Sequence, residues 1–181
     1  MQNNSSRGLS FYIYEWFEAI LTAVVAISII FAFGFRIISV SGQSMENTLK
    51  DEDKVLITNF NYQPKDGDIV VITHAKNFSE NIIKRVIATQ GQSLNIDFST
   101  GQVTVDGKVL NEPYIKNSTI TNEGGEIPSV VPQGYIFVMG DNRQNSKDSR
   151  SSEIGLIENG AVLGKARAII YPISRFTTLY K

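Results

Sequence analysis

The chain has 181 residues, a formal net charge of −1 and a hydrophobic fraction of 42%, which is enough apolar material for one domain with a core. This near-neutral charge gives no sign of the basic surface with which proteins bind nucleic acid, so no nucleic-acid partner is expected. The chain lacks cysteine, which excludes disulfides, cysteine nucleophiles and thiolate metal sites.

The first element is an uncharged stretch of seventeen residues from Ala19 to Phe35, which Glu18 and Arg36 bracket. At a rise of ~1.5 Å per residue, a helix of this length measures about 26 Å, at the short end of what spans a bilayer. Aromatic residues of the kind found at membrane interfaces precede it: Tyr12, Tyr14, Trp16 and Phe17.

A single-pass membrane anchor is the best of three interpretations of this stretch. Small residues at Ala32 and Gly34 also fit the cleavage site of a signal peptide, but the preceding segment is aromatic and has one basic side chain, Arg7. A buried core helix is disfavoured because the stretch is apolar on every face. Three parts are then expected: a short tail over residues 1–18, a transmembrane helix over 19–36 and a β-rich domain over 37–181, whose extracytoplasmic location is an expectation from the resemblance described below.

Charge alone does not set the orientation of this anchor. Arg7 precedes the stretch, whereas Arg36, Lys50 and Lys54 follow it. This count favours a cytoplasmic location for the large domain, but large domains cross the membrane largely regardless of such counts.

Beyond residue 36, short apolar runs alternate with turn residues, and no periodic helix of convincing length is present. The pair Asp106-Gly107 between alternating apolar residues predicts a β-hairpin. The runs predicted as strands are Lys54–Phe60, Ile69–Thr73, Asn81–Thr89, Ser93–Phe98, Gln102–Leu110, Tyr135–Gly140 and Ala166–Tyr171. The predicted class is therefore mainly β, a barrel-like or complex antiparallel domain preceded by one transmembrane α-helix.

The only histidine, His74, follows the run Ile69–Thr73 and is interpreted as a surface residue at a strand end. A Ser-His-Asp triad would have to use it. Because histidine is the commonest metal ligand and only one is present, neither a metal nor a cofactor is predicted.

Ser44 and Lys84 are the candidate catalytic residues. A serine hydroxyl needs a base, and burial lowers the pKa of a lysine enough for it to serve as one. Lys84 lies in the run Asn81–Ile87, whose two strand faces are both mainly apolar. Taken alone, Lys84 is equally well interpreted as an ordinary lysine that keeps its charged amine in water. Taken alone, Ser44 is a weak candidate, because turn formation is the ordinary interpretation of a serine near glycine.

A third segment, Gly140–Arg150, gathers hydrogen-bonding side chains and opposite charges directly after a predicted strand. A solvated loop has a similar composition, but so does a polar network beneath an active site.

Together these segments resemble the type I signal peptidases, the membrane-bound serine proteases that release exported proteins from their signal peptides. The resemblance covers roughly residues 37–172. Ser41–Leu49 is similar to the family's serine box, Ile82–Ala88 to its lysine box, and Gly140–Arg150 with Gly155 to its acidic box. Two shorter segments also match: Gly67–Val71 and Asn111–Tyr114.

The resemblance implies roles for these residues. Ser44 is then the nucleophile and Lys84 the general base, and the Ser44 backbone N–H donates to the oxyanion. Ser146 would hydrogen-bond the lysine amine, and two ion pairs, Asp141 with Arg85 and Asp148 with Arg150, would support the site. Gly42 stands where some members carry a serine that assists the oxyanion hole, so backbone donors are expected to suffice here.

The resemblance also implies that a signal peptide binds as an extended strand between two segments, with small pockets for alanine-like side chains at positions −1 and −3. The residues expected to bind substrate are Ile37, Ile38, Ser39, Val40, Ser41, Met45, Asn81, Ile82 and Ile83. The implied partners are preproteins and membrane lipid, with secretion or surface-assembly machinery as a further one, and the implied topology has a cytoplasmic N-terminus.

The sequence departs from the family pattern beside both catalytic candidates. Asn47 stands where the serine box usually has proline, and Ala88–Gln92 replaces the usual Gly-Leu-Pro-Gly-Asp. These departures leave a second hypothesis open, a divergent or non-catalytic membrane assembly factor on the same scaffold. A soluble self-cleaving Ser-Lys regulator is disfavoured by the apolar span.

Overall fold

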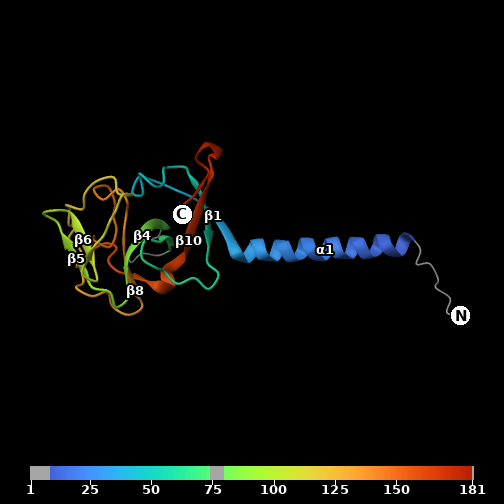
Figure 1. The fold of residues 1–181 in the computed structure, drawn as a ribbon, viewed down its shortest axis with the longest axis horizontal. Coiled ribbons are helices and arrows are strands. Elements are labelled where there is room, and N and C mark those ends of the chain that lie inside the picture. The colour runs from blue at the N-terminus through green and yellow to red at the C-terminus, as the bar shows by residue number, and fades with distance from the viewer. Residues whose placement is uncertain (1–8, 74–79, 181) are drawn as a thin grey trace. The chain divides into compact units, whose positions relative to one another are not determined.

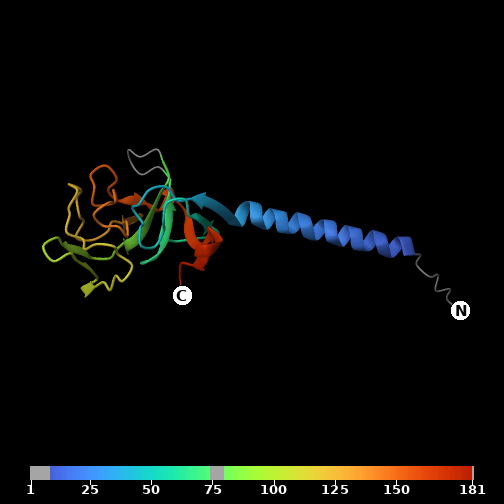
Figure 2. The same cartoon turned by 90° about the horizontal axis from the view of Figure 1, so that it is seen from above.

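A computed structural model describes residues 9–73 and 80–180 of the chain. His74, interpreted above as a strand-end residue, lies outside them. The chain divides into two compact units, residues 1–36 and 37–181. Figures 1 and 2 show the helix of the first unit and the strands of the second from two directions.

The first unit contains one α-helix, α1 (Leu9–Gly34). It begins before the predicted residue 19, because the aromatic residues ahead of the uncharged stretch continue the same helix. Its window Phe11–Ser28 is long and apolar enough to cross a membrane, and none of that window is buried. Two hydroxyls within it, on Thr22 and Ser28, donate to the carbonyl oxygens four residues earlier, which satisfies these polar groups inside the helix.

The second unit consists of an eight-stranded and a three-stranded antiparallel sheet, which confirms the predicted mainly β class. The eight-stranded sheet has the order β1-β2-β10-β3-β4-β8-β9, with β11 also paired to β10. Its strands are β1 (Phe35–Ser39), β2 (Lys54–Thr58), β3 (Ile69–Ile72), β4 (Ile82–Thr89), β8 (Tyr135–Met139), β9 (Ile157–Glu158), β10 (Val162–Tyr171) and β11 (Thr177–Thr178). The small sheet contains β5 (Leu94–Asp97), β6 (Gln102–Val105) and β7 (Lys108–Val109). Two 3-10 turns, η1 (Asn159–Ala161) and η2 (Ile173–Arg175), flank β10.

The strands form where apolar runs meet turn residues. Asp106 and Gly107 both have positive φ, 49° and 74°, as a two-residue hairpin turn between β6 and β7 requires. Strands β1, β9 and β11 were not among the predicted runs. Two of them have only two residues, too few for an alternating pattern, and β1 begins inside the uncharged stretch assigned to the span.

The core lies on both faces of the large sheet, and β3 is fully buried along its length. One cluster of buried residues joins β2, β3 and β10 to Val40, Met45 and Leu49, which flank Ser44 in the sequence. A second cluster covers β8 and Ile154, and a third joins β4 and β8 to the small sheet. The loop that carries Ser44 is therefore anchored to the core on both sides.

Candidate active site

Ser44 lies in the loop between β1 and β2, and its position is fixed by its neighbours. Met45 and Leu49 are buried, and the Leu49 N–H donates to the Met45 carbonyl over 2.9 Å. Gly42 has a φ of 84°, which favours glycine, and its N–H donates to Asp51 over 2.8 Å. Ser44 itself is half-buried, so its hydroxyl is held in place yet remains accessible.

Lys84 lies on β4, and its side chain ends at Ser44. The distance from Lys84 Nζ to Ser44 Oγ is 2.7 Å, and the same nitrogen donates to the Ile83 carbonyl over 3.0 Å. Lys84 is only 3% exposed. Burial lowers the pKa of its amine from 10.5 to about 8, although the charges of Asp148, Asp141 and Glu123 oppose this change. The structure thus places beside a serine hydroxyl a lysine that can lose its proton near neutral pH.

The pairing of β4 leaves the segment before Lys84 open on one side. β3 pairs with β4 over Ile82–Arg85, whereas β8 pairs with β4 only from Arg85 onward. Within the part of the chain that the structure describes, the first residues of β4, Ile82 and Ile83, therefore have a partner strand on one side only. An extended peptide can add to such an edge beside Ser44 and Lys84, which are called the dyad below.

The residues expected to bind substrate have different environments. Ser39, Ser41 and Asn81 are exposed, as is Ile37, whose exposed fraction is 60%. Ile38 on β1 and Ile82 at the start of β4 are half-buried, and Ile83, the next residue of β4, is buried. The remaining two, Val40 and Met45, lie inside the core cluster, so their contribution is to the shape of the loop.

Gly140 is where the acidic segment meets Ser44. A Cβ at this position would lie within 2.5 Å of both Ser146 Oγ and the Ser44 carbonyl oxygen, so only glycine fits. Two residues later, the Asn142 N–H donates to the same carbonyl over 3.0 Å. The Ser44 N–H itself donates to no group in residues 9–73 and 80–180, which leaves it available to a ligand.

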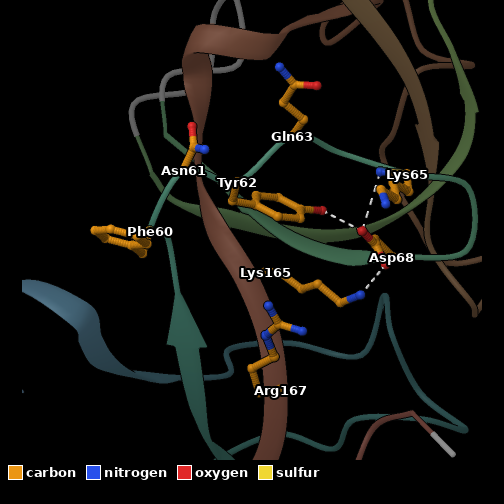
Figure 3. Close-up of a pocket in the computed structure, with 8 residues that line it drawn as sticks. All are labelled: Phe60, Asn61, Tyr62, Gln63, Lys65, Asp68, Lys165 and Arg167. Carbon is orange, nitrogen blue, oxygen red and sulfur yellow. Dashed lines mark hydrogen bonds and ion pairs between the residues drawn. The ribbon is translucent and has the colours of Figure 1, made fainter.

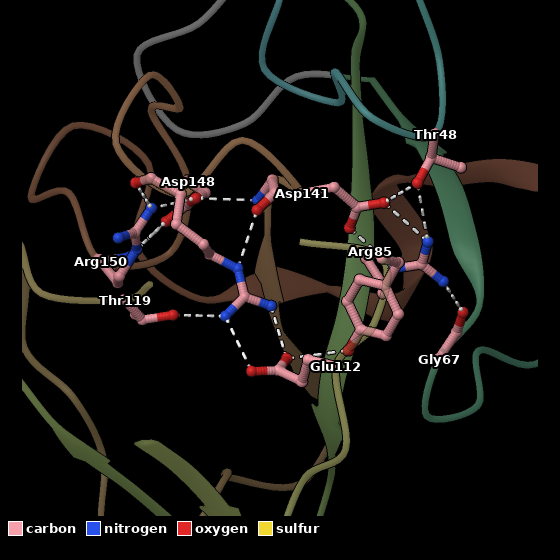
Figure 4. A network of polar contacts seen from close by, with 11 residues as sticks. Thr48, Gly67, Arg85, Glu112, Thr119, Asp141, Asp148 and Arg150 are labelled. Atoms are coloured by element: carbon pink, nitrogen blue, oxygen red, sulfur yellow. Dashed lines mark hydrogen bonds and ion pairs between the residues drawn. The ribbon is translucent and has the colours of Figure 1, made fainter. Parts of the chain in front are cut away.

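Arg85 and Asp141 form a buried two-point ion pair, which Figure 4 shows as part of a larger polar network, near Thr48 and Gly67. Arg85 Nε donates to Asp141 Oδ1 over 2.8 Å, and Nη2 donates to Oδ2 over 2.7 Å. Burial would lower the pKa of Arg85, but the hydrogen bonds and charge of Asp141 outweigh it, so the pKa is raised. Thr48 donates to the same carboxylate, and Gly67 O accepts from Arg85 over 2.8 Å.

Asp148 and Arg150 form the second ion pair, and both side chains are fully buried. Arg150 donates to the carboxylate through Nε and Nη2, each over 2.8 Å. Asp148 also accepts from the Gly140 N–H over 2.9 Å. The structure therefore brings together both pairs that the resemblance implies, and the second pair holds the glycine on which Ser44 packs.

Ser146 departs from expectation. Its hydroxyl is buried but has no hydrogen-bond partner in the part of the chain that the structure describes. The expected hydrogen bond to the Lys84 amine is therefore not formed, because the amine is directed at Ser44 Oγ and the Ile83 carbonyl instead. Ser146 packs against Gly140, beside the Ser44 carbonyl.

A third buried ion pair, between Arg143 and Glu112, was not predicted. Arg143 Nη2 lies 2.6 Å from Glu112 Oε1, and Arg143 is fully buried. Tyr114 also donates to Glu112, over 2.9 Å, and its ring centroid lies 3.9 Å from the Arg85 guanidinium. The match of Asn111–Tyr114 to a family segment marked this region without assigning it a role.

Side-chain hydrogen bonds stabilise both segments that depart from the family pattern. Asn47 has a φ of 102°, and its amide donates to the Ile115 carbonyl over 3.3 Å. Gln92 accepts from the Thr89 N–H over 2.7 Å and donates to Asp66 over 2.7 Å. Neither departure displaces Ser44 from Lys84.

A separate pocket of about 500 Å³ lies between the segment after β2 and strand β10 (Figure 3). Its buried Asp68 accepts hydrogen bonds from Tyr62, over 2.7 Å, and from Lys165. Neither dyad residue lines it. Asp68 directly follows Gly67, whose carbonyl oxygen accepts a hydrogen bond from Arg85. The hydrogen bonds to Asp68 therefore stabilise the turn that holds this carbonyl beside Arg85.

Comparison with known proteins shows which family the chain resembles. The chain matches the family model described as "Signal peptidase, peptidase S26" over residues 13–171. It is 33% identical over 174 residues to signal peptidase I of Bacillus licheniformis, covering 90% of each chain. It is 31% identical over 182 residues to signal peptidase IB of Staphylococcus aureus (strain COL), covering 91% of this chain and 92% of that one. A solved signal peptidase I from Enterococcus faecalis V583 superimposes with a TM-score of 0.47 at 24% identity, over 57% of this chain and 97% of that chain.

Proposed function

The chain belongs to the peptidase S26 family and is a membrane-anchored serine peptidase that removes signal peptides from preproteins, and we propose that Ser44 and Lys84 carry out its chemistry. The observation that supports this assignment is the distance of 2.7 Å between Ser44 Oγ and a Lys84 amine that is almost fully buried. A serine and a desolvated lysine form a complete nucleophile and base without histidine.

The dyad acts in two steps. The neutral Lys84 amine takes the Ser44 hydroxyl proton while Oγ adds to the scissile carbonyl carbon. The resulting ammonium gives that proton to the leaving amine nitrogen, and the C–N bond breaks to leave an acyl ester on Ser44. Water, deprotonated by the same amine, then adds to the ester carbonyl carbon. The C–Oγ bond breaks, the ammonium returns its proton to Ser44 Oγ, and the signal peptide leaves with a new carboxylate.

The negative oxygen of each tetrahedral intermediate needs donors that are already in place. The Ser44 N–H is such a donor, because it has no partner within the described residues. The Gly42 N–H donates to Asp51 and is therefore not available to the oxyanion. The second donor thus comes from another group than Gly42.

The substrate lies as an added strand along the open side of β4. Ile82 and Ile83 supply backbone hydrogen bonds there, and Ile37–Ser41 forms the opposite wall. Small pockets between these segments select alanine-like side chains at positions −1 and −3. This placement brings the carbonyl of the −1 residue to Ser44 Oγ.

The membrane sets where the enzyme meets its substrate. We assign the N-terminus to the cytoplasm and residues 37–181 to the extracytoplasmic side, with membrane lipid around the span. The span was expected over residues 19–36, but α1 ends at Gly34 and residues 35 and 36 belong to β1, so we assign it to α1. Ser44 follows the end of α1 closely in the sequence, so the site stays near the bilayer that holds the apolar helix of a signal peptide. Confinement to one surface raises the rate of encounter without any further contact.

Cleavage of a preprotein by the purified full chain in detergent tests the assignment. We expect wild type to cut after a small residue, as N-terminal sequencing of the product reports, and Ser44→Ala and Lys84→Ala to lose activity. Ser129→Ala and Lys108→Ala are matched controls, because both residues are exposed. If either dyad variant cleaves as well as wild type, the assignment is wrong.

A further inference from the structure

Glu112 connects two parts of the polar network beneath the dyad. Its carboxylate is 7% exposed and accepts two hydrogen bonds from Arg143, over 2.6 Å and 3.1 Å. It also accepts from the Tyr114 hydroxyl over 2.9 Å. Burial, followed by the charge of Glu112, raises the pKa of this phenol, so Tyr114 remains a neutral donor at any physiological pH.

The contact with Arg143 leads to Ser44. Arg143 Nε donates to the Gly140 carbonyl over 3.0 Å, while Asp148 accepts from the Gly140 N–H over 2.9 Å. Charged side chains therefore hold both polar groups of this glycine. Because Gly140 packs directly against the Ser44 carbonyl and Ser146, movement of Gly140 moves the nucleophile.

The contact with Tyr114 leads to Lys84. The Tyr114 ring lies against the Arg85 guanidinium at 3.9 Å, and Arg85 follows Lys84 on β4. The direction of the Arg85 side chain, fixed by Asp141 and Tyr114, fixes the strand from which Lys84 projects. Glu112 thus contacts a support of each dyad residue, Arg143 on the Ser44 side and Tyr114 on the Lys84 side.

The charges of this region balance in pairs. Three buried carboxylates, on Glu112, Asp141 and Asp148, face three buried guanidinium groups, on Arg143, Arg85 and Arg150. Among residues 9–73 and 80–180, Lys84 forms no ion pair, and its amine contacts Ser44 Oγ and the Ile83 carbonyl oxygen. Half-buried Glu123 and the two aspartates favour its protonated form, and burial opposes it. Any loss of balance in the pairs therefore changes the electrostatic potential at the Lys84 amine.

We propose that Glu112 and Arg143, joined by Tyr114, are positioning residues of the peptidase reaction, which hold Gly140 and Arg85 so that Ser44 and Lys84 meet and keep the surrounding charge neutral. This proposal rests on the assignment of Ser44 and Lys84 above. A buried ion pair adds little net stability compared with apolar side chains of the same size. What the pair contributes is fixed geometry and charge balance at the dyad.

The first test is steady-state kinetics of the full chain in detergent. We expect Glu112→Gln and Arg143→Gln to lower kcat by about 100-fold with little change in KM, since misplaced reacting groups slow the chemical step. Tyr114→Phe keeps the ring against Arg85 and loses only the bond to Glu112, so we expect a smaller loss, about tenfold. Arg143→Lys keeps the charge but not the planar fork, and we expect it to restore only part of the rate.

The second test is the pH profile, which a merely structural role would leave unchanged. Glu112→Gln removes a negative charge, disfavours the ammonium form of Lys84 and moves the acidic limb of the kcat/KM profile to lower pH. Arg143→Gln removes a positive charge and moves the same limb to higher pH. Shifts of opposite sign are the expected result, and NMR of lysine labelled with ¹³C at Cε reports the same shifts without any activity.

The double variant Lys147→Gln with Glu153→Gln is the control, because this ion pair belongs to the same segment but is exposed to solvent. We expect it to have wild-type kcat and pH profile. The proposal is overturned if folded Glu112 and Arg143 variants retain wild-type kcat, or if both shift the Lys84 titration in the same direction. If wild type itself cleaves no preprotein, the Ser44–Lys84 assignment fails, and the NMR titration still decides the charge-balance role of Glu112 and Arg143.

Discussion

Lys84 and Arg85 are neighbours on one strand, and both are buried, but their surroundings are opposite. The Lys84 amine meets a hydroxyl and a backbone carbonyl. The Arg85 guanidinium meets a carboxylate at two points, a carbonyl and an aromatic ring. Burial lowers the pKa of the first, and Asp141 raises the pKa of the second.

This difference fits the two roles proposed above, Lys84 as the base and Arg85 as part of its support. A cation buried without a counter-charge gives up its proton easily, which is what a general base requires. A cation buried against a counter-charge keeps its proton and its direction, which is what a rigid support requires. The alternation of a β-strand points the two side chains in opposite directions, so the two environments stay separate.

The largest expected effect on stability follows from breaking the ion pair between Arg85 and Asp141. Asp141→Asn leaves Arg85 as a buried charge without a counter-charge, so we expect the free energy of unfolding to fall by about 3–5 kcal/mol, measured by chemical denaturation. The matched double variant, Arg85→Met with Asp141→Leu, removes both charges and is expected to cost much less. If the double variant is less stable than the single one, the buried charge of Arg85 without its counter-charge is not the cause of the loss.

Removal of the Lys84 amine, which forms no ion pair in the described part of the chain, is expected to raise stability rather than lower it. Lys84→Met removes the proposed base, so we expect it to abolish cleavage. It also removes a cation whose burial is unfavourable, so we expect the variant to gain up to about 3 kcal/mol of stability at pH 7, less the value of two lost hydrogen bonds. The folded pKa of about 8 lies below the ordinary 10.5, so the folded state binds fewer protons between these values.

The stability of wild type therefore rises with pH from about 8 to about 10.5, and below pH 8 the penalty is fully present. The gain from Lys84→Met is expected below pH 8 and should vanish above pH 10.5. Denaturation curves of both proteins at pH 6, 8 and 10 measure it. A difference in stability that does not depend on pH would show that Lys84 is not desolvated.

Much of the fold followed from local patterns in the sequence. The apolar runs bounded by turns contain β2 to β8, and the pair Asp106-Gly107 lies at the predicted hairpin. The run Ala166–Tyr171 covers only the second part of β10, which already begins at Val162. The order of strands in the sheet did not follow, because it places β10 between β2 and β3. Such pairing depends on contacts between distant residues, which leave no periodic trace in a single sequence.

The dyad and two of its ion pairs were predicted by resemblance, and the rest of the site was not. Glu112 and Arg143 are thirty-one positions apart, in loops without periodicity, so nothing local marks them as partners. For Ser146, the segment was identified but the implied hydrogen bond to the Lys84 amine is not formed in the structure. The direction of its hydroxyl depends on how closely Gly140 packs, which no spacing rule predicts.

Activity should depend on pH as the unpaired lysine does. With a pKa of about 8, about a tenth of Lys84 is neutral at pH 7 and about nine-tenths at pH 9. We therefore expect kcat/KM to rise about tenfold between these values and then level off, as initial rates with a fixed preprotein will report. An acidic optimum would contradict a lysine base.

The smallest effect is expected where an ion pair is exposed. Lys147 and Glu153 lie in or beside the same segment as the buried pairs, 2.8 Å apart, but their side chains are 55% and 51% exposed. Water already solvates both charges, so we expect Lys147→Gln to change the free energy of unfolding by less than about 1 kcal/mol, and less still at high salt. Chemical denaturation at low and high salt measures both values. A loss as large as that of Asp141→Asn would mean that distance, rather than burial, decides the strength of these pairs, and the contrast between Lys84 and Arg85 would then need another cause.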